Sequence, residues 1–143
     1  MSRRRVLVGS TDESWVEELR EKLEQGGYRV EVARLVSEVI RRARNGAVEV
    51  LIVGDELEGV RASELVSLVK GIEGGVQVIV VSTEESLGVV RRLRGAGIFY
   101  QAMKPVDMEE LKSAVGCAFE KVERERAWEE GFFRVLTPSP VAA

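Results

Sequence analysis

The sequence predicts one α/β domain with a doubly wound, five-stranded parallel sheet and five helices. Short apolar segments alternate with amphipathic segments along nearly the whole chain, which is the pattern of repeated strand–helix units. Two of the apolar segments are almost free of polar residues, as expected for parallel strands covered on both faces. The length of 143 residues fits a single domain, and 45% apolar with 31% charged residues is typical of a globular chain.

The first two strand–helix units cover the first third of the chain. A strand is predicted over 6–8, and the segment after it has apolar residues at helical spacing. Gly26 and Gly27 end this helix, and a second strand is predicted over 28–33. The second helix ends before Gly46. The expected apolar faces of the two helices are Trp15, Val16, Leu19 and Leu23, and Val36, Val39, Ile40 and Ala43.

Three more units complete the predicted sheet. Strands over 48–53 and 76–81 are the two nearly continuous apolar runs, and the last strand is predicted over 98–103. Asp107 and Glu110 have capping-box spacing, so a last helix should begin directly after Asp107. The apolar faces of these helices are expected at Leu65, Leu68, Val69 and Ile72, at Leu87, Val90 and Leu93, and at Leu111, Val115, Ala118, Phe119 and Val122.

The last helix is expected to extend beyond the domain. Polar residues follow Val122, late aromatic residues come next, and two prolines lie near the end. We therefore predict a domain over 1–122 and an extended helix with a flexible tail over 123–143. The late aromatics either pack on the chain's own surface or contact another chain, which leaves a homodimer open.

Composition argues against several classes of function. The net charge of −3, with both signs interspersed, gives no reason to expect a nucleic acid or an anionic membrane as partner. The chain has no histidine and one cysteine, Cys117, so it lacks a disulfide, the usual transition-metal ligands and the commonest general base. We therefore predict that the chain is not an enzyme and that it binds no cofactor. No apolar stretch has the length of a membrane span or a signal peptide, so a cytoplasmic location is expected.

Polar residues that could carry chemistry follow four of the predicted strands. In a doubly wound sheet a site forms outside the carboxyl ends of the strands, near the point where strand order reverses. The candidates are Ser10, Thr11 and Asp12 after the first strand, Gly54, Asp55 and Glu56 after the third, Ser82 and Thr83 after the fourth, and Lys104 and Pro105 after the fifth.

These loops, in this order, resemble those of response-regulator receiver domains, which carry an acidic pair, a phosphoacceptor aspartate, a Ser or Thr, and a Lys-Pro. The similarity covers residues 4–122 and is best at 78–82 and 104–111. The resemblance implies a flavodoxin-like fold with strand order 2-1-3-4-5, and it makes Pro105 a candidate for a cis peptide. It also implies a role in two-component signal transduction or a phosphorelay, with a sensor kinase or an output protein as partner.

The chain departs from the family pattern at the positions that phosphoryl transfer requires. Alignment places Ser10 and Thr11 at the two acidic positions. Gly54 stands at the acceptor position, and Asp55 follows one place later. Transfer needs a carboxylate that attacks phosphorus and a divalent cation held by hard oxygen ligands. Glycine has no such oxygen, so we predict a degenerate pocket without metal, in a pseudo-receiver that serves as a phosphorylation-independent interaction module.

Two alternatives stay open. In the first, Asp55 is a fallback phosphoacceptor and Mg²⁺ is needed. Adjacent strand residues point to opposite faces, but a turn at Gly54 could redirect the Asp55 side chain. In the second, the chain binds a flavin or another small ligand, because residues 9–14 resemble the hydroxyl-rich phosphate loop of flavodoxins.

The remaining candidates have simpler expected roles. Lys104 should pair with Asp12, with Asp55 or with solvent. Ser82 has capping-box spacing to Glu85 and is predicted to cap the fourth helix. A partner or second copy is expected to bind through the fourth helix, the fifth strand and the last helix. The aromatic residues of this expected interaction surface are Phe99, Tyr100, Trp128, Phe132 and Phe133.

Overall fold

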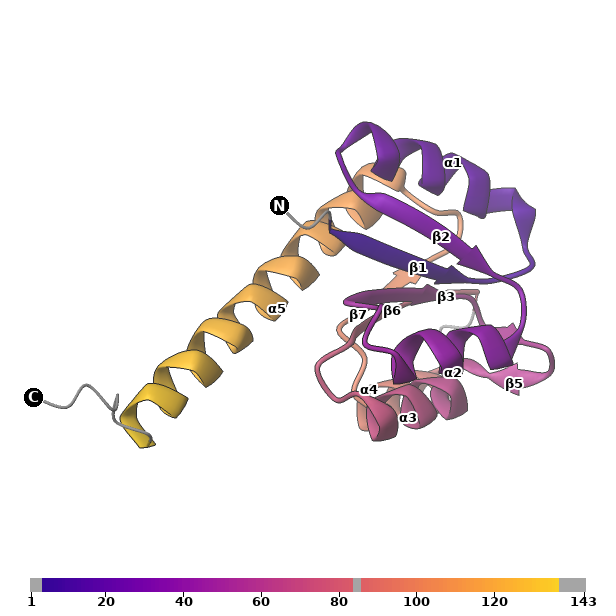
Figure 1. Cartoon of the computed structure of the whole chain (residues 1–143). Coiled ribbons are helices and arrows are strands. Elements are labelled where there is room, and N and C mark those ends of the chain that lie inside the picture. The colour runs from indigo at the N-terminus through magenta and orange to yellow at the C-terminus, as the bar shows by residue number, and fades with distance from the viewer. Residues whose placement is uncertain (1–3, 84–85, 137–143) are drawn as a thin grey trace, which may run out of the picture.

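The computed structural model describes residues 4–83 and 86–136, and side chains only up to residue 131. Its centre is a five-stranded parallel sheet in the order β2-β1-β3-β6-β7 (Figure 1). The predicted order 2-1-3-4-5 is confirmed, since β6 and β7 are the fourth and fifth strands of this sheet. The strands are β1 (Arg5–Gly9), β2 (Arg29–Ala33), β3 (Val50–Val53), β6 (Gln77–Ser82) and β7 (Tyr100–Met103).

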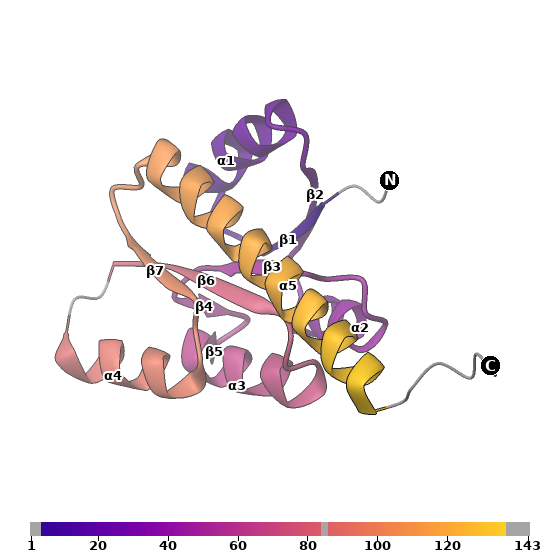
Figure 2. The same ribbon diagram turned by 90° about the vertical axis from the view of Figure 1, so that its left-hand side faces the viewer.

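Five helices cover the two faces of the sheet. Helices α1 and α5 lie on one face, and α2, α3 and α4 lie on the other (Figures 1 and 2). Each helix follows a strand in the chain, as the alternation of apolar and amphipathic segments predicts. The helices are α1 (Glu13–Gln25), α2 (Val36–Arg44), α3 (Ala62–Ile72), α4 (Leu87–Ala96) and α5 (Met108–Leu136).

The central strand β3 sends its side chains alternately to the two faces. Val50 and Ile52 belong to the core under α1 and α5, and Leu51 and Val53 belong to the core under α2, α3 and α4. All four side chains are at most 1% exposed. This alternation continues past the strand and decides on which side the next two residues lie.

The apolar face predicted for α3 is partly wrong. Leu65 and Val69 are buried, but Leu68 is 51% exposed and Ile72 is 38% exposed. Val66, which the sequence pattern did not single out, is fully buried in their place. The helix is therefore rotated relative to the predicted face, and the two larger side chains lie toward solvent.

A short hairpin between β3 and α3 was not predicted. Its strands are β4 (Glu56–Leu57) and β5 (Val60–Arg61), paired antiparallel. Both turn residues have positive φ, 51° at Glu58 and 77° at Gly59, as a two-residue hairpin loop with type I′ geometry requires. The Glu58 carboxylate accepts a hydrogen bond from the Val36 amide at 2.6 Å, which supplies the cap that α2 otherwise lacks.

The predicted start of α5 is confirmed. Asp107 Oδ1 accepts hydrogen bonds from the amides of Glu109, at 3.0 Å, and Glu110, at 3.2 Å. The helix begins at Met108. One carboxylate thus satisfies two of the amides that a helix start leaves without partners.

Replacing this cap should weaken the domain measurably. Asp107→Ala is expected to lower the free energy of unfolding by about 1 kcal/mol, because two α5 amides lose their acceptor. Urea unfolding followed by circular dichroism measures the change. Asp107→Asn is the matched control, because asparagine caps as well as aspartate. Equal losses for the two variants would contradict the capping role.

The capping role predicted for Ser82 is wrong. Ser82 is the last residue of β6, and the N-cap of α4 is Ser86, whose Oγ accepts from the Val89 amide at 3.3 Å. The spacing to Glu85 is therefore not a helix start, since α4 begins later, at Leu87. The Ser82 hydroxyl donates instead to Asp55.

Helix α5 projects beyond the sheet, as Figures 1 and 2 show. Its side chains are buried on one face as far as Val122, after which nearly all of those described are exposed. Arg126 pairs with Glu49 at 3.2 Å, and Trp128 is 71% exposed. The side chains of Phe132 and Phe133 and the predicted tail over 137–143 lie outside the described residues. Within the described part, no helix has the length and apolar character needed to cross a membrane.

Candidate functional site

The carboxyl edge of the sheet brings most of the predicted site residues together. The loops after β1, β3, β6 and β7 meet there, because parallel strands end on the same side. Lys104 Nζ lies 2.7 Å from Asp12 Oδ2, and these residues are 92 positions apart in the chain. Of the partners expected for Lys104, the structure selects Asp12. This ion pair joins the loop after β7 to the start of α1.

Asp12 is held by several hydrogen bonds. Its Oδ1 accepts from the amide of Ser14 at 3.0 Å and from the Ser14 hydroxyl at 2.6 Å, which makes Asp12 the N-cap of α1. Its own amide donates to Ser10 Oγ at 3.0 Å. Hydrogen bonds from Lys104 and then Ser14 hold the pKa of the Asp12 carboxyl well below its usual range.

Removing the lysine should raise the pKa of Asp12. In Lys104→Met the carboxyl loses its strongest donor, so carbon-13 NMR should find the pKa shifted upward. Because the folded pKa is depressed, the pair stabilises the fold above the unfolded pKa of about 3.9 and this stabilisation fades as pH falls below it. The natural chain should then lose more stability than Lys104→Met on acidification below about pH 4. The control Lys121→Met should keep the natural pKa of Asp12, and an unchanged pKa in Lys104→Met would contradict the pairing.

Gly54 continues the side of β3 that faces α1. A Cβ built at Gly54 would lie 3.7 Å from Ser10 Oγ and 3.7 Å from a ring carbon of Trp15. Both are ordinary van der Waals contacts, so the site has room for a Cβ there. Ser10 is buried, and Thr11 beside it is exposed. Gly54, Ser10 and the Lys104–Asp12 pair thus share this side of the sheet edge.

Asp55 lies on the opposite side, toward α3 and α4. Its Oδ1 accepts from Ser82 Oγ at 2.7 Å, and its Oδ2 accepts from Thr83 Oγ1 at 2.9 Å and from the Thr83 amide at 3.2 Å. Its backbone carbonyl accepts from the Ala62 amide at 2.9 Å, at the first turn of α3. Asp55 therefore ties the hairpin after β3 to the end of β6. Thr83 was expected at this edge of the sheet, but its contact with Asp55 was not predicted, because no spacing rule links residues 28 positions apart.

Acceptors for a divalent cation are few at this edge. A protein usually binds Mg²⁺ through one or two carboxylates, while waters and phosphate oxygens complete its octahedral shell. Asp12 is already paired with Lys104, Ser10 Oγ accepts from a backbone amide, and Asp55 lies on the other side of the sheet edge. No group of three or more acidic or cysteine side chains within the described residues could hold a metal ion. The residues present do not fit Mg²⁺.

The remaining candidates lie around β7. The Lys104–Pro105 peptide bond is cis, as the resemblance implied. The Lys104 amide donates to the Ser82 carbonyl at 3.0 Å, which fixes the two loops against each other. Phe99 and Tyr100 are half-buried and pack on the core under α1 and α5, and the Tyr100 hydroxyl donates to Glu110. Only part of each ring is therefore open to a partner.

Comparison with known proteins agrees with this architecture. The family model of the response regulator receiver domain matches residues 6–116. A receiver domain protein (CheY-like) from Methanospirillum hungatei JF-1 superposes with a TM-score of 0.80 at 24% identity, over 87% of this chain and 99% of that one. The signal receiver domain of an HD domain-containing protein from Pseudomonas fluorescens Pf-5 superposes with a TM-score of 0.82 at 20% identity, over 89% of this chain and 94% of that one.

A third structure is the beryllofluoride-activated NtrC4 receiver domain dimer, with a TM-score of 0.76, 22% identity, and coverage of 82% of this chain and 98% of that one. A search among curated proteins found no match. The matched family model spans most of the chain, and the sheet order and the cis Lys-Pro bond accord with it. The chain belongs to the response regulator receiver domain family.

Proposed function

We propose that this receiver domain is a pseudo-receiver, which works in two-component signalling as a protein-interaction module without being phosphorylated. The observation that carries the proposal is the position of Asp55. Its carboxylate lies on the α3–α4 side of the sheet edge, with both oxygens bound by Ser82 and Thr83, while Lys104 lies on the other side with Asp12.

The alternation of β3 supports this assignment. Gly54 stands at the family's acceptor position and faces Ser10 and Trp15. It has no oxygen with which to attack phosphorus. Asp55 lies on the same side of the sheet as Leu51 and Val53. Its carboxylate is therefore directed away from Lys104 and Ser10. Gly54 does not have a positive φ, and the hairpin of β4 and β5 follows directly after Asp55.

The charges at the carboxyl edge of the sheet also support the pseudo-receiver proposal. In phosphoryl transfer a cation and a lysine neutralise the charge of the phosphoryl oxygens. Here Lys104 already neutralises Asp12, and the donor set of the described residues does not suit Mg²⁺. The proposal therefore includes no metal and no catalytic activity of the chain itself.

The flavodoxin-type alternative lacks such support. A phosphate bound at the start of α1 would need free backbone amides. The Ser14 amide donates to Asp12 Oδ1 and the Asp12 amide donates to Ser10 Oγ, and the Asp12 carboxylate would repel the phosphate. Flavin mononucleotide should accordingly give no thermal shift of the purified protein.

The partner is expected on the surface formed by α4, β7 and α5, where Leu87 of α4 is 62% exposed. Trp128, 71% exposed, lies on the projecting part of α5. A sensor kinase or an output protein is the expected partner, and a second copy of this chain is the alternative. The NtrC4 receiver domain, which shares the fold, is described as a dimer in its activated form.

Intact mass spectrometry tests the proposal. After incubation with acetyl phosphate and Mg²⁺ the natural chain should keep its mass, because the acceptor position carries no carboxylate. Asp55→Asn is the matched variant and should behave identically. A phosphoryl adduct on the natural chain that disappears in Asp55→Asn would overturn the proposal in favour of phosphorylation at Asp55.

A further inference from the structure

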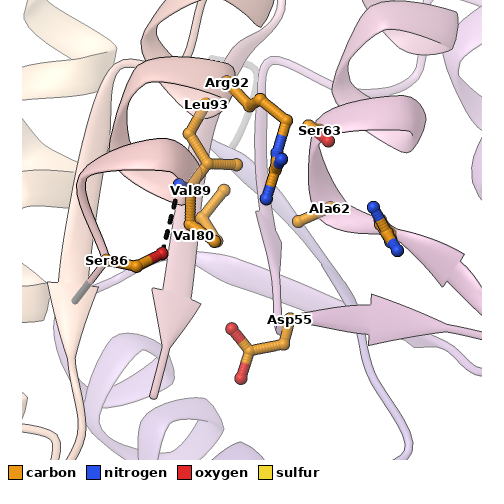
Figure 3. Close-up of a pocket in the computed structure, with 9 residues that line it drawn as sticks. Asp55, Ala62, Ser63, Val80, Ser86, Val89, Arg92 and Leu93 are labelled. Carbon is orange, nitrogen blue, oxygen red and sulfur yellow. Dashed lines mark hydrogen bonds between the residues drawn. The ribbon is translucent and has the colours of Figure 1, made fainter. Parts of the chain in front are cut away.

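We propose that the groove between α3 and α4 is a binding site for a small organic anion, namely a phosphate monoester with an apolar or planar body. This site does not rest on the function proposed above. A cavity of about 380 Å³ lies there, within the range of about 300–1,000 Å³ typical of small-molecule pockets. Figure 3 shows its lining. The residues are Asp55, Arg61, Ala62, Ser63, Val80, Ser86, Val89, Arg92 and Leu93.

Two arginines give the cavity its charge. Arg92 reaches from α4 into the space between Leu93 and Ser63, as Figure 3 shows, and Arg61 lines the cavity from the end of β5. Neither guanidinium forms an ion pair within the described residues, whereas other surface arginines do, such as Arg4 with Glu123 and Arg126 with Glu49. Two like charges at one cavity repel each other, and a bound anion would relieve that repulsion.

Among the described residues, Asp55 is the carboxylate that lines this cavity, and its single negative charge offsets only one of the two guanidinium charges. Its two oxygens accept from Ser82 and Thr83. The two guanidinium groups and the one carboxylate of the lining leave a net positive charge, which favours the binding of a small anion. A phosphate suits this site because two of its oxygens can accept paired, parallel hydrogen bonds from one planar guanidinium group.

Two helix starts lie at the same space. The first turn of α3, with Ala62 and Ser63, and the N-cap of α4, Ser86, both line the cavity. The N-cap of α3 is Arg61, which makes no side-chain cap hydrogen bond. The Ala62 amide already donates to the Asp55 carbonyl and the Val89 amide to Ser86 Oγ, so the helix starts add to the attraction of the arginines through their partial positive charge and not through these two amides.

The apolar wall explains why the ligand should be organic. Val80, Val89 and Leu93 lie together on one side of the cavity, and Ala62 lies across from them (Figure 3). A shallower groove of about 650 Å³ shares Ser63 and Arg92 with it and continues along α3 and α4. Leu68, 51% exposed, lines this continuation. The phosphate would lie at the arginines, with an apolar or planar body against this wall.

Isothermal titration calorimetry on the full chain tests the site, with phenyl phosphate and adenosine 5′-monophosphate as probes. Saturable 1:1 binding is expected. Arg61→Met and Arg92→Met should each weaken it by about tenfold or more, because each removes charge-assisted hydrogen bonds. Arg94→Met is the matched control, since Arg94 lies on α4 but does not line the cavity. It should leave the affinity unchanged.

Three results of the calorimetry would overturn the proposal. The first is absence of binding by both monoesters, and the second is equal weakening by all three arginine variants. The third is binding of inorganic phosphate, or of an acidic peptide, at least as tight as that of the monoesters. Both lining arginines are exposed, and circular dichroism of each variant verifies that the fold is intact. Titration of nitrogen-15-labelled protein should also shift the amide signals of Ser63 and Ser86, and unshifted signals would place the ligand elsewhere.

Discussion

A variant with three new carboxylates, Ser10→Asp, Thr11→Asp and Gly54→Asp, is expected to take up one phosphoryl group from acetyl phosphate in the presence of Mg²⁺. The natural chain should take up none. The substitutions place acidic residues at the acceptor position and at the two cation-binding positions by which the receiver family is recognised. Lys104 is already nearby, 2.7 Å from Asp12, and a Cβ at Gly54 fits at ordinary contact distance from Trp15. The expected change is all or none, because an attacking oxygen is created where there was none.

Intact mass spectrometry and peptide mapping measure this gain, and the modified residue should be the one at position 54. The matched control is the double variant Ser10→Asp, Thr11→Asp, which gains acidic ligands but no nucleophile. A triple variant that stays unmodified would contradict the claim that missing carboxylates alone prevent transfer. An adduct on the double variant would show that a different residue accepts the phosphoryl group.

Phe119→Ala is expected to lower the free energy of unfolding by about 3–5 kcal/mol, well above the loss expected for the α5 cap. The Phe119 side chain is 1% exposed, lies in the core under α1 and α5, and stacks on Tyr28 with ring centroids 5.4 Å apart. Its removal leaves a cavity between α5 and the sheet, and the surrounding structure relaxes only partly. Urea unfolding of natural and variant proteins gives the difference.

Trp128→Ala is the matched control, an aromatic truncation on the same helix. Trp128 is 71% exposed, so this change should stay within about 0.5 kcal/mol of the natural protein. The two variants together test whether the apolar packing of α5 is confined to its part up to Val122, since beyond it the helix contacts the domain through the Arg126–Glu49 ion pair. Equal losses would contradict this division, since they would mean that the projecting half also packs on the domain.

The sheet and its helices follow from patterns that the sequence carries openly. Buried parallel strands show as nearly unbroken apolar runs, as in Val50–Val53, and a capping aspartate shows by its place before an apolar helix, as with Asp107. The position of the site can also be predicted from the sequence, because the carboxyl ends of parallel strands lie at one edge of the sheet. Lys104 and Asp12 were both predicted to lie there, and they form the expected kind of ion pair.

The remaining features depend on contacts between distant segments. Ser82 has cap spacing in the sequence, but its hydroxyl reaches Asp55 because β3 and β6 are neighbours in the sheet. The Glu58–Gly59 hairpin lacks the Asn-Gly or Asp-Gly signal of a tight turn, so its strands were not predicted. The exposure of Leu68 depends on the rotation of α3 about its axis, which helical periodicity alone does not set. The cavity beside Arg92 is likewise a product of helix packing.

Nuclear magnetic resonance of the nitrogen-15-labelled natural chain, titrated with Mg²⁺ and beryllofluoride, tests most directly whether the phosphoryl site lacks its nucleophile. Beryllofluoride forms a phosphoryl-like adduct only on an available aspartate carboxylate beside a bound cation. The amide signals of Gly54, Asp55, Thr83 and Lys104 should stay in place, since Ser82 and Thr83 hold Asp55 and the Lys104 ammonium is paired with Asp12. Saturable shifts of these four signals that vanish in Asp55→Asn would show a working acceptor and contradict phosphorylation-independent function.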